Sequence, residues 1–187
     1  MQACFNARMT LIYSFPAVVD ARAHTLVLGS MPGALSLQAN QYYAHPQNAF
    51  WRIMGDLFGA HRELAYPDRL RLLQHHGLAL WDVLKCCIRQ GSLDSSIFED
   101  SIEPNDLATL LRDHPRIERV FFNGSKAEQS FKRYVRLPAL ASPPRFARLP
   151  STSPAHATLN YAAKLEAWRL LLSPPAARKG PCEASPS

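Results

Sequence analysis

One short segment near the start of the chain concentrates side chains that could hold a flat, polar ligand. It runs from Gly29 to Trp51, reads GSMPGALSLQANQYYAHPQNAFW, and includes Asn40, Tyr43 and His45. A tyrosine ring is a stacking surface for any nucleobase. An asparagine amide both donates and accepts hydrogen bonds, so it can orient a water molecule or read a base edge. Packing against a sheet is the commoner arrangement for a lone tyrosine, and His45 suits a turn as well as it suits catalysis.

The segment opens with a turn of small residues, Gly29-Ser-Met-Pro-Gly33. Glycines allow a ligand to approach the backbone closely, and exposed N–H groups can bind an anion. A tight turn without a ligand fits the same residues. The pattern is neither G-x-G-x-x-G nor a phosphate loop, which disfavours nucleoside triphosphates. Ser30 does not lie in a nucleophile elbow, so a serine hydrolase is a weaker interpretation.

Two other segments carry polar groups that could act in chemistry or binding. Pro150-Ser-Thr-Ser-Pro-Ala-His156 offers hydroxyl and backbone N–H groups that suit phosphate binding, although capping of a helix by Ser151 or Ser153 explains them equally well. Asp82 and Asp94 could be acid–base groups. A solvated or capping role is the alternative for both, and it is stronger for Asp94.

The elements that must position these residues alternate between strands and helices. Short apolar runs predict strands at Thr25–Ser30, Leu78–Val83, Arg119–Asn123 and Arg145–Leu149. Helical patterns lie between them, among them one that Gly59 closes, one that begins at Pro104 and one that a capping box at Ser125 opens. Strand–helix alternation predicts an α/β fold with a parallel sheet. Ligands of such folds bind at the carboxyl ends of the strands. The segments Gly29–Asn48, Lys85–Ser101, Asn123–Lys126 and Pro150–His156 should therefore meet there as loops.

Composition narrows the class of protein. The chain has 187 residues, of which 47% are hydrophobic, and a formal net charge of +6. We expect one domain over residues 1–172 and a disordered Pro/Ser/Ala-rich tail over residues 173–187. No apolar run suits a membrane span or a signal peptide, so we expect a cytoplasmic protein. Four cysteines without C-x-x-C pairing disfavour a disulfide framework, an iron–sulfur cluster and structural zinc. The positive charge favours polyanionic partners such as nucleic acid.

Four motifs in order, each after a predicted strand, resemble the uracil-DNA glycosylase superfamily and most closely its hypoxanthine-DNA (deoxyinosine) glycosylase family. They are LGSMPG with QYYAHPQNAFW, LWDVLKCCIRQGSLDSSI, FFNGSKA and LPSTSPAHA, and the resemblance covers Tyr13 to Leu172. It implies a three-layer α/β/α sandwich around a short, mainly four-stranded parallel sheet. It also implies a monofunctional DNA glycosylase that excises a deaminated base, acts on DNA as a monomer and needs no metal or cofactor.

The resemblance also assigns roles to residues, with two departures. Met31 stands where the superfamily commonly carries a catalytic Asn or Asp, and Leu149 stands where the best-known uracil enzymes carry His, which argues against efficient uracil excision. Asn40 is the nearest polar residue able to substitute and is predicted to be catalytic, with Tyr43 stacking on the base. The predicted base-binding residues are Gly29, Ser30, Met31, Tyr43, Trp81, Asp82 and Asn123, and the predicted DNA contacts are Pro32, Gly33, Ser125, Lys126, Ser151, Ser153, Pro154 and His156.

Three other functions remain open at this point. A uracil or xanthine glycosylase could use the same pocket, because all three bases present a six-membered ring with a carbonyl edge. A catalytically inactive binder of damaged DNA fits the two departures. A small-molecule hydrolase that uses Ser30 is the third.

Overall fold

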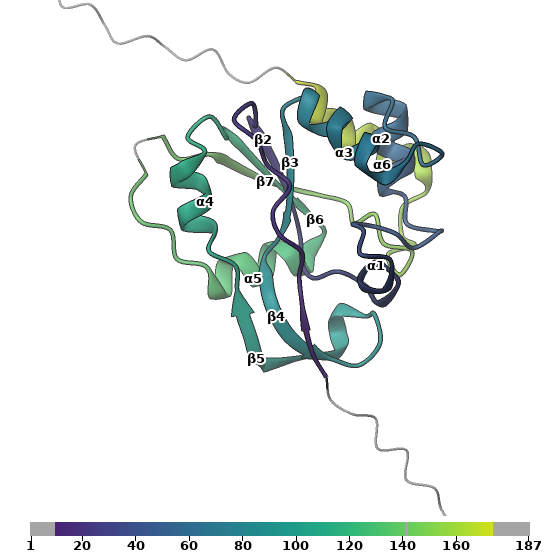
Figure 1. The fold of residues 1–187 in the computed structure, drawn as a ribbon. Coiled ribbons are helices and arrows are strands. Elements are labelled where there is room, and N and C mark those ends of the chain that lie inside the picture. Colours follow the sequence, from purple (N-terminus) through teal and green to yellow (C-terminus); the bar gives the residue numbers. More distant parts are fainter. Residues whose placement is uncertain (1–9, 141, 174–187) are drawn as a thin grey trace, which may run out of the picture.

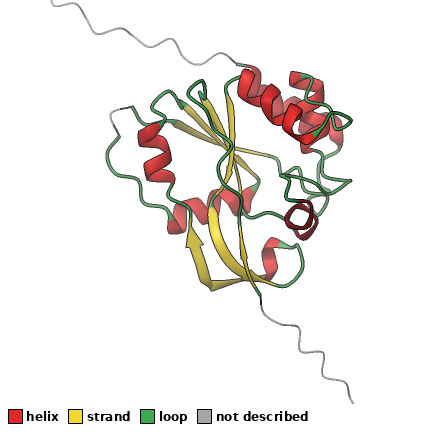
Figure 2. Ribbon diagram, in the orientation of Figure 1, coloured by secondary structure: helices red, strands yellow, loops and turns green. Residues whose placement is uncertain are grey.

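The computed structural model describes residues 10–140 and 142–173 and shows a parallel sheet of four strands between two layers of helices (Figures 1 and 2). The strands are β2 (Thr25–Gly29), β3 (Leu78–Asp82), β6 (Arg119–Asn123) and β7 (Arg145–Leu149), in the spatial order β3-β2-β6-β7. Each lies within one residue of the strand that the apolar runs predict. Every position of β2, in the middle of the sheet, is buried.

The register of the sheet brings the carboxyl ends of the four strands to one edge. Gly29 at the end of β2 is paired with Asp82 at the end of β3, and Asn123 at the end of β6 is paired with Leu149 at the end of β7. The predicted post-strand segments therefore start beside one another.

Helices cover both faces of the sheet, as expected for an α/β/α sandwich. The helices α2 (Phe50–Phe58), α3 (Tyr66–His75) and α6 (Tyr161–Trp168) pack on one face, and α4 (Leu107–Asp113) and α5 (Ser125–Tyr134) pack on the other (Figure 1). Alternate strand residues supply the two cores, because successive side chains of a strand point to opposite faces. Val27 and Phe121 contact the α2 side, whereas Leu28 and Phe122 contact the α4 side. A short 3₁₀ helix, η2 (Arg169–Leu172), follows α6.

A second sheet lies beside the first and was not predicted. It is antiparallel and contains β1 (Leu11–Tyr13), β4 (Leu84–Arg89) and β5 (Ile97–Pro104) in the order β1-β4-β5. The prediction of a loop over Lys85–Ser101 is therefore wrong: the segment forms most of a hairpin, whose tip carries the 3₁₀ helix η1 (Asp94–Ser96). Two register shifts interrupt the β4–β5 pairing, and they obscure the two-residue alternation by which a strand is recognised in sequence.

The helix starts also differ from prediction at two places. Pro104 ends β5 instead of opening a helix, and α4 is capped by Asp106, whose side chain accepts the Thr109 N–H at 3.0 Å. Gly124 caps α5 without a side-chain hydrogen bond, so Ser125 forms no capping box. A short helix, α1 (Ala34–Ala39), lies in the first post-strand segment. Residues 174–187, most of the predicted tail, lie outside the described residues. No helix in the described ranges is long and apolar enough to cross a membrane.

Candidate active site

A cavity of about 250 Å³ opens at the carboxyl ends of the parallel strands. The turn Gly29–Gly33 forms one wall, and Tyr43 and Asn48 contribute to another. Asp82 and Asn123 line it from the ends of β3 and β6, and residues 151–155 complete it from the loop after β7. The predicted post-strand segments thus meet around one open cavity.

Asp82 is the most unusual group in this cavity. The residue is 3% exposed, and its Oδ2 has no hydrogen-bond partner within the described part of the chain. Burial, reinforced by the negative charge of Asp94 and opposed by Arg89, raises the pKa of Asp82 to about 8. The carboxyl group is therefore mostly protonated at neutral pH and can donate a hydrogen bond into the cavity.

Tyr43 presents an aromatic surface that is held from behind. Its ring stacks on Phe50 with centroids 3.9 Å apart and an angle of 23° between the planes. Burial raises the pKa of the Tyr43 hydroxyl, so the phenol is neutral, and the Asn123 side chain lies within hydrogen-bonding reach of it. One face of the ring is covered by Phe50, and the residue also lines the cavity. This arrangement suits stacking of a flat ligand on the tyrosine.

Asn48 is the asparagine of the first motif that reaches the cavity. Its side-chain Oδ1 accepts the backbone N–H of Phe50 at 3.0 Å. Its backbone N–H donates to the His45 carbonyl at 2.9 Å. Arg62 fixes the same loop by donating to the carbonyls of Ala44 and Pro46 at 2.8 and 2.6 Å. Sequence reasoning gave Asn48 no role, although it belongs to the same motif as Tyr43 and directly precedes helix α2.

The structure does not bring Asn40 and Trp81 to the cavity. Asn40 is exposed and forms the C-cap of α1 with φ of 51°, a left-handed conformation that asparagine tolerates well. Trp81 precedes Asp82 in β3, so its side chain points to the other face of the sheet. There its indole N–H donates to the Phe15 carbonyl at 3.0 Å. Neither residue lines the cavity in this structure.

The Gly29–Gly33 turn is braced from the β4–β5 hairpin. The Ser30 hydroxyl donates to the Asp94 carboxylate, both of whose oxygens lie 2.9 Å away. The Arg89 guanidinium donates to the Pro32 carbonyl at 2.6 Å. Met31 lines the cavity and is 7% exposed, so an apolar thioether occupies the predicted place of a catalytic amide or carboxylate.

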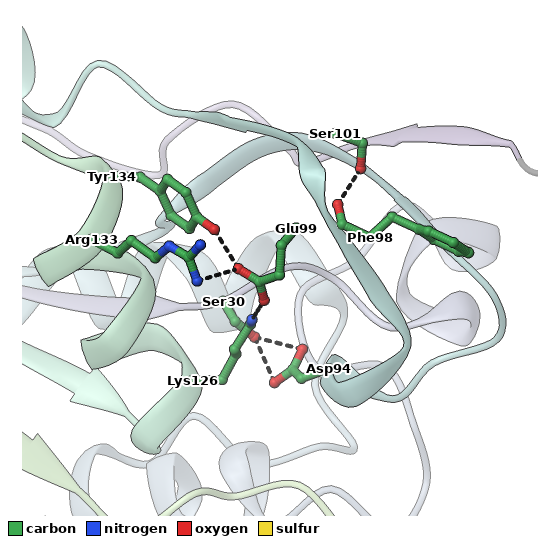
Figure 3. A network of polar contacts seen from close by, with 8 residues as sticks. All are labelled: Ser30, Asp94, Phe98, Glu99, Ser101, Lys126, Arg133 and Tyr134. Atoms are coloured by element: carbon green, nitrogen blue, oxygen red, sulfur yellow. Dashed lines mark hydrogen bonds and ion pairs between the residues drawn. The ribbon is translucent and has the colours of Figure 1, made fainter.

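The predicted DNA contacts fall into two groups. Pro32, Gly33, Ser151, Ser153 and Pro154 line the cavity, and Asn123 holds the last loop by exchanging two hydrogen bonds of 2.9 Å with Thr152. Ser125, Lys126 and His156 instead line a neighbouring groove of about 340 Å³. The Lys126 ammonium is engaged by Glu99, as Figure 3 shows.

Ionisable side chains in the described ranges do not gather as metal ligands do: no group of three or more His, Cys, Asp or Glu residues is placed to hold an ion.

Comparison with known proteins agrees with this architecture. The family model of the Uracil DNA glycosylase superfamily matches residues 16–172. Two relatives called Hypoxanthine DNA glycosylase, from Methanosarcina acetivorans and Methanosarcina barkeri, are 41% and 39% identical over 114 residues, which are 60% of this chain and 71% of each relative. A solution NMR structure of a candidate uracil DNA glycosylase from Methanosarcina acetivorans superposes on this chain with a TM-score of 0.66 and 34% sequence identity. The match covers 88% of this chain and 100% of that protein. The chain therefore belongs to the uracil DNA glycosylase superfamily and is a DNA glycosylase.

Proposed function

We propose that this glycosylase excises hypoxanthine from deoxyinosine in DNA as a monofunctional hydrolase. The relatives called Hypoxanthine DNA glycosylase support the choice of base. The observation that carries the proposal is the buried carboxyl group of Asp82, which lines the cavity and whose Oδ2 has no hydrogen-bond partner among the described residues; burial also raises its pKa, which favours the neutral acid. A neutral acid at that place can donate a hydrogen bond to a base that leaves as an anion.

The base enters the cavity by extrusion from the DNA. Flipping a nucleotide costs a few kcal/mol, and least for a poorly paired base such as hypoxanthine. Stacking on the free face of Tyr43 returns about 1–3 kcal/mol. Because Phe50 already supports the other face, the tyrosine needs no rearrangement to receive the base.

The polar edge of the base is read from the ends of two strands. Protonated Asp82 donates to a carbonyl oxygen or ring nitrogen of hypoxanthine, and the bond strengthens as negative charge develops on the ring. Asn123 donates one hydrogen bond to Thr152 and accepts one from it, and its second amide N–H, which lies near the Tyr43 hydroxyl, turns to the base when the base is bound. The backbone of Gly29, Ser30 and Met31 completes the contact surface.

The bond between C1′ and N9 breaks first, and its electron pair passes to the hypoxanthine ring. Water then adds to C1′ and releases a proton to the solvent, and the hypoxanthine anion takes up a proton, which yields the neutral free base and an abasic sugar. Asn48 orients this water through its amide, and the amide dipole stabilises the positive charge of the sugar. No lysine is among the residues found to line the cavity, which supports water as the nucleophile and a monofunctional reaction.

The DNA strand on either side of the flipped nucleotide runs over the two loops that frame the cavity. Pro32 and Gly33 contact it from one side and Ser151, Ser153 and Pro154 from the other. Ser125, Lys126 and His156 approach phosphates in the adjoining groove. We propose that the enzyme acts as a monomer.

An excision assay tests this function. Labelled oligonucleotides that each carry one deoxyinosine, deoxyuridine or deoxyxanthosine are incubated with the protein and cleaved with alkali. We expect strand breaks at deoxyinosine and far slower breakage at deoxyuridine, because Met31 and Leu149 replace the usual catalytic side chains of uracil enzymes. Faster excision of uracil or xanthine would overturn the choice of base. A shift of DNA on a gel without cleavage would identify a binder of damaged DNA instead.

A further inference from the structure

An exposed leucine stands at the rim of the cavity, where an apolar side chain has no folding role to explain it. Leu93 is 54% exposed and is the most exposed leucine of the described ranges. It lines both the cavity and the neighbouring groove of about 340 Å³, so it stands where the two spaces meet. Single exposed apolar side chains are common on protein surfaces, so the exposure of Leu93 gains meaning only from its place between the cavity and the groove and from the way its loop is held.

The loop that carries Leu93 is tied down on both sides of it. Before it, the Ser92 hydroxyl oxygen accepts the Ala34 N–H at 3.0 Å. After it, Asp94 binds the Ser30 hydroxyl. Both partners belong to the segment that forms a wall of the cavity, so the position of Leu93 relative to the cavity is fixed from both flanks.

The start of strand β5, directly after the loop, is anchored a second time, to helix α5. Glu99 pairs with Lys126 and Arg133 and accepts the Tyr134 hydroxyl, as Figure 3 shows beside the Ser30–Asp94 contact. A loop that is held on both sides of Leu93 and again at Glu99 presents its exposed side chain with little freedom. This rigidity suits a residue that must push into another molecule.

The other loops at the rim offer few side chains of this kind. The loop after β7 contributes Ser151, Thr152, Ser153, Pro154, Ala155 and His156, none of which is a large aliphatic residue. Leu35 is 42% exposed and lines the cavity, but it does not reach the groove. Leu93 is therefore the aliphatic side chain best placed between the pocket for the base and the adjoining surface for the strand.

We infer that Leu93 is the wedge that enters the duplex and fills the gap left by the flipped nucleotide. Proteins that distort DNA commonly insert an apolar side chain between bases, because it replaces the lost stacking contacts. The inference rests on the proposed function, since a wedge has a purpose only where a base is extruded. It adds a residue of the β4–β5 hairpin to a site otherwise built from the ends of the parallel strands.

Comparison of duplex and single-stranded substrates tests the wedge. We expect Leu93→Ala to lower deoxyinosine excision from duplex DNA on the order of tenfold and to leave excision from single strands within about twofold, because only the duplex has a stack to open. Leu93→Met keeps a large apolar side chain and should restore duplex activity. Leu170→Ala is the matched control, since Leu170 is 50% exposed and lies outside the cavity and the groove.

A fluorescence measurement separates the wedge from the chemistry. A duplex carries 2-aminopurine beside a 2′-fluorinated deoxyinosine that resists cleavage, and emission rises when the neighbouring base leaves the stack. We expect the wild-type protein and Leu170→Ala to raise emission and Leu93→Ala to raise it far less. Equal emission with Leu93→Ala, or a duplex-specific loss with Leu35→Ala instead, overturns the assignment of Leu93. If the wild-type protein opens the duplex but cuts no deoxyinosine, the proposed reaction fails while the wedge stands.

Discussion

Gly29 and Asp82 are paired residues at the ends of neighbouring parallel strands, and they approach each other so closely that no side chain fits between them. A Cβ on residue 29 would overlap the Asp82 carboxyl group and would come within 3.2 Å of the Tyr43 hydroxyl. Gly29 does not have a positive φ. A glycine is therefore needed at this position because there is no room for a side chain, and not because of the backbone conformation. The absence of a side chain at Gly29, in the motif LGSMPG, thus leaves room for the carboxyl group of Asp82, which belongs to the motif LWDVLKCCIRQGSLDSSI.

A methyl group at Gly29 should therefore disturb the cavity. We predict that Gly29→Ala lowers deoxyinosine excision by at least about tenfold and also lowers the melting temperature, because overpacking at a buried site costs roughly 1–3 kcal/mol. Gly33→Ala is the matched control for stability, since its Cβ would meet only Ser92 atoms at 3.9 Å. Thermal melts and excision assays of both variants check the prediction, and equal behaviour of the two would contradict the close approach of Gly29 and Asp82.

The activity should decline at alkaline pH because Asp82 loses its proton. Its pKa is raised to about 8, so the carboxyl group donates a hydrogen bond to the base below that pH and becomes a buried anion above it. We predict a fall in single-turnover excision rate above pH 8. Asp82→Asn keeps a neutral donor and should remove this fall. The exposed Asp100→Asn is the control and should keep the wild-type profile. If the excision rate of Asp82→Asn still falls above pH 8, another group causes the fall.

The same carboxyl group should make stability depend on pH. Between about pH 4, where an unfolded aspartate ionises, and about pH 8, where Asp82 ionises in the folded protein, the folded state binds one more proton than the unfolded state. The free energy of unfolding therefore falls as pH rises through this window, by up to about 1.4 kcal/mol per pH unit from this residue. Urea unfolding at several pH values measures it. Asp82→Asn should be less sensitive to pH across the window, and an unchanged slope would rule out the buried acid.

Asn48, and not Asn40, should affect catalysis. Asn48 lines the cavity, whereas Asn40 is exposed at the end of α1. We predict that Asn48→Ala lowers the excision rate on the order of a hundredfold, as expected when a preorganised polar group at a reaction centre is removed. Asn40→Ala should stay within a few-fold of wild type.

One further variant separates catalysis by Asn48 from its structural role. Asn48 also accepts the Phe50 N–H at 3.0 Å, and Asn48→Asp retains an oxygen for that bond. Single-turnover rates together with DNA affinity distinguish the roles: a catalytic residue changes the rate while binding persists. Loss of activity in Asn40→Ala with full activity in Asn48→Ala would reverse the assignment.

The parallel sheet could be predicted from sequence because its signal is local. The strands β2, β3, β6 and β7 are short apolar runs that are separated by helices, and a strand buried on both faces requires just such a run. The rule that ligands bind at the carboxyl ends of parallel strands then placed Gly29, Asp82 and Asn123 near one another. The hairpin β4–β5 carried no such signal, because its polar residues and shifted register conceal the alternation.

Sequence by itself determined which segments surround the site, since strand order along the chain and turn residues after each strand are local properties. Only the tertiary structure decided which side chain of each segment faces the cavity. The six-residue helix α1 turns the chain so that Asn40 caps its end and Asn48 reaches the cavity, and strand alternation turns Trp81 away while Asp82 enters. Leu93 lies at the rim of the cavity because the neighbouring residues of its hairpin are hydrogen-bonded to Ser30 and Ala34. Side-chain direction depends on contacts between residues that are distant in sequence, and the local pattern of residue types does not encode them.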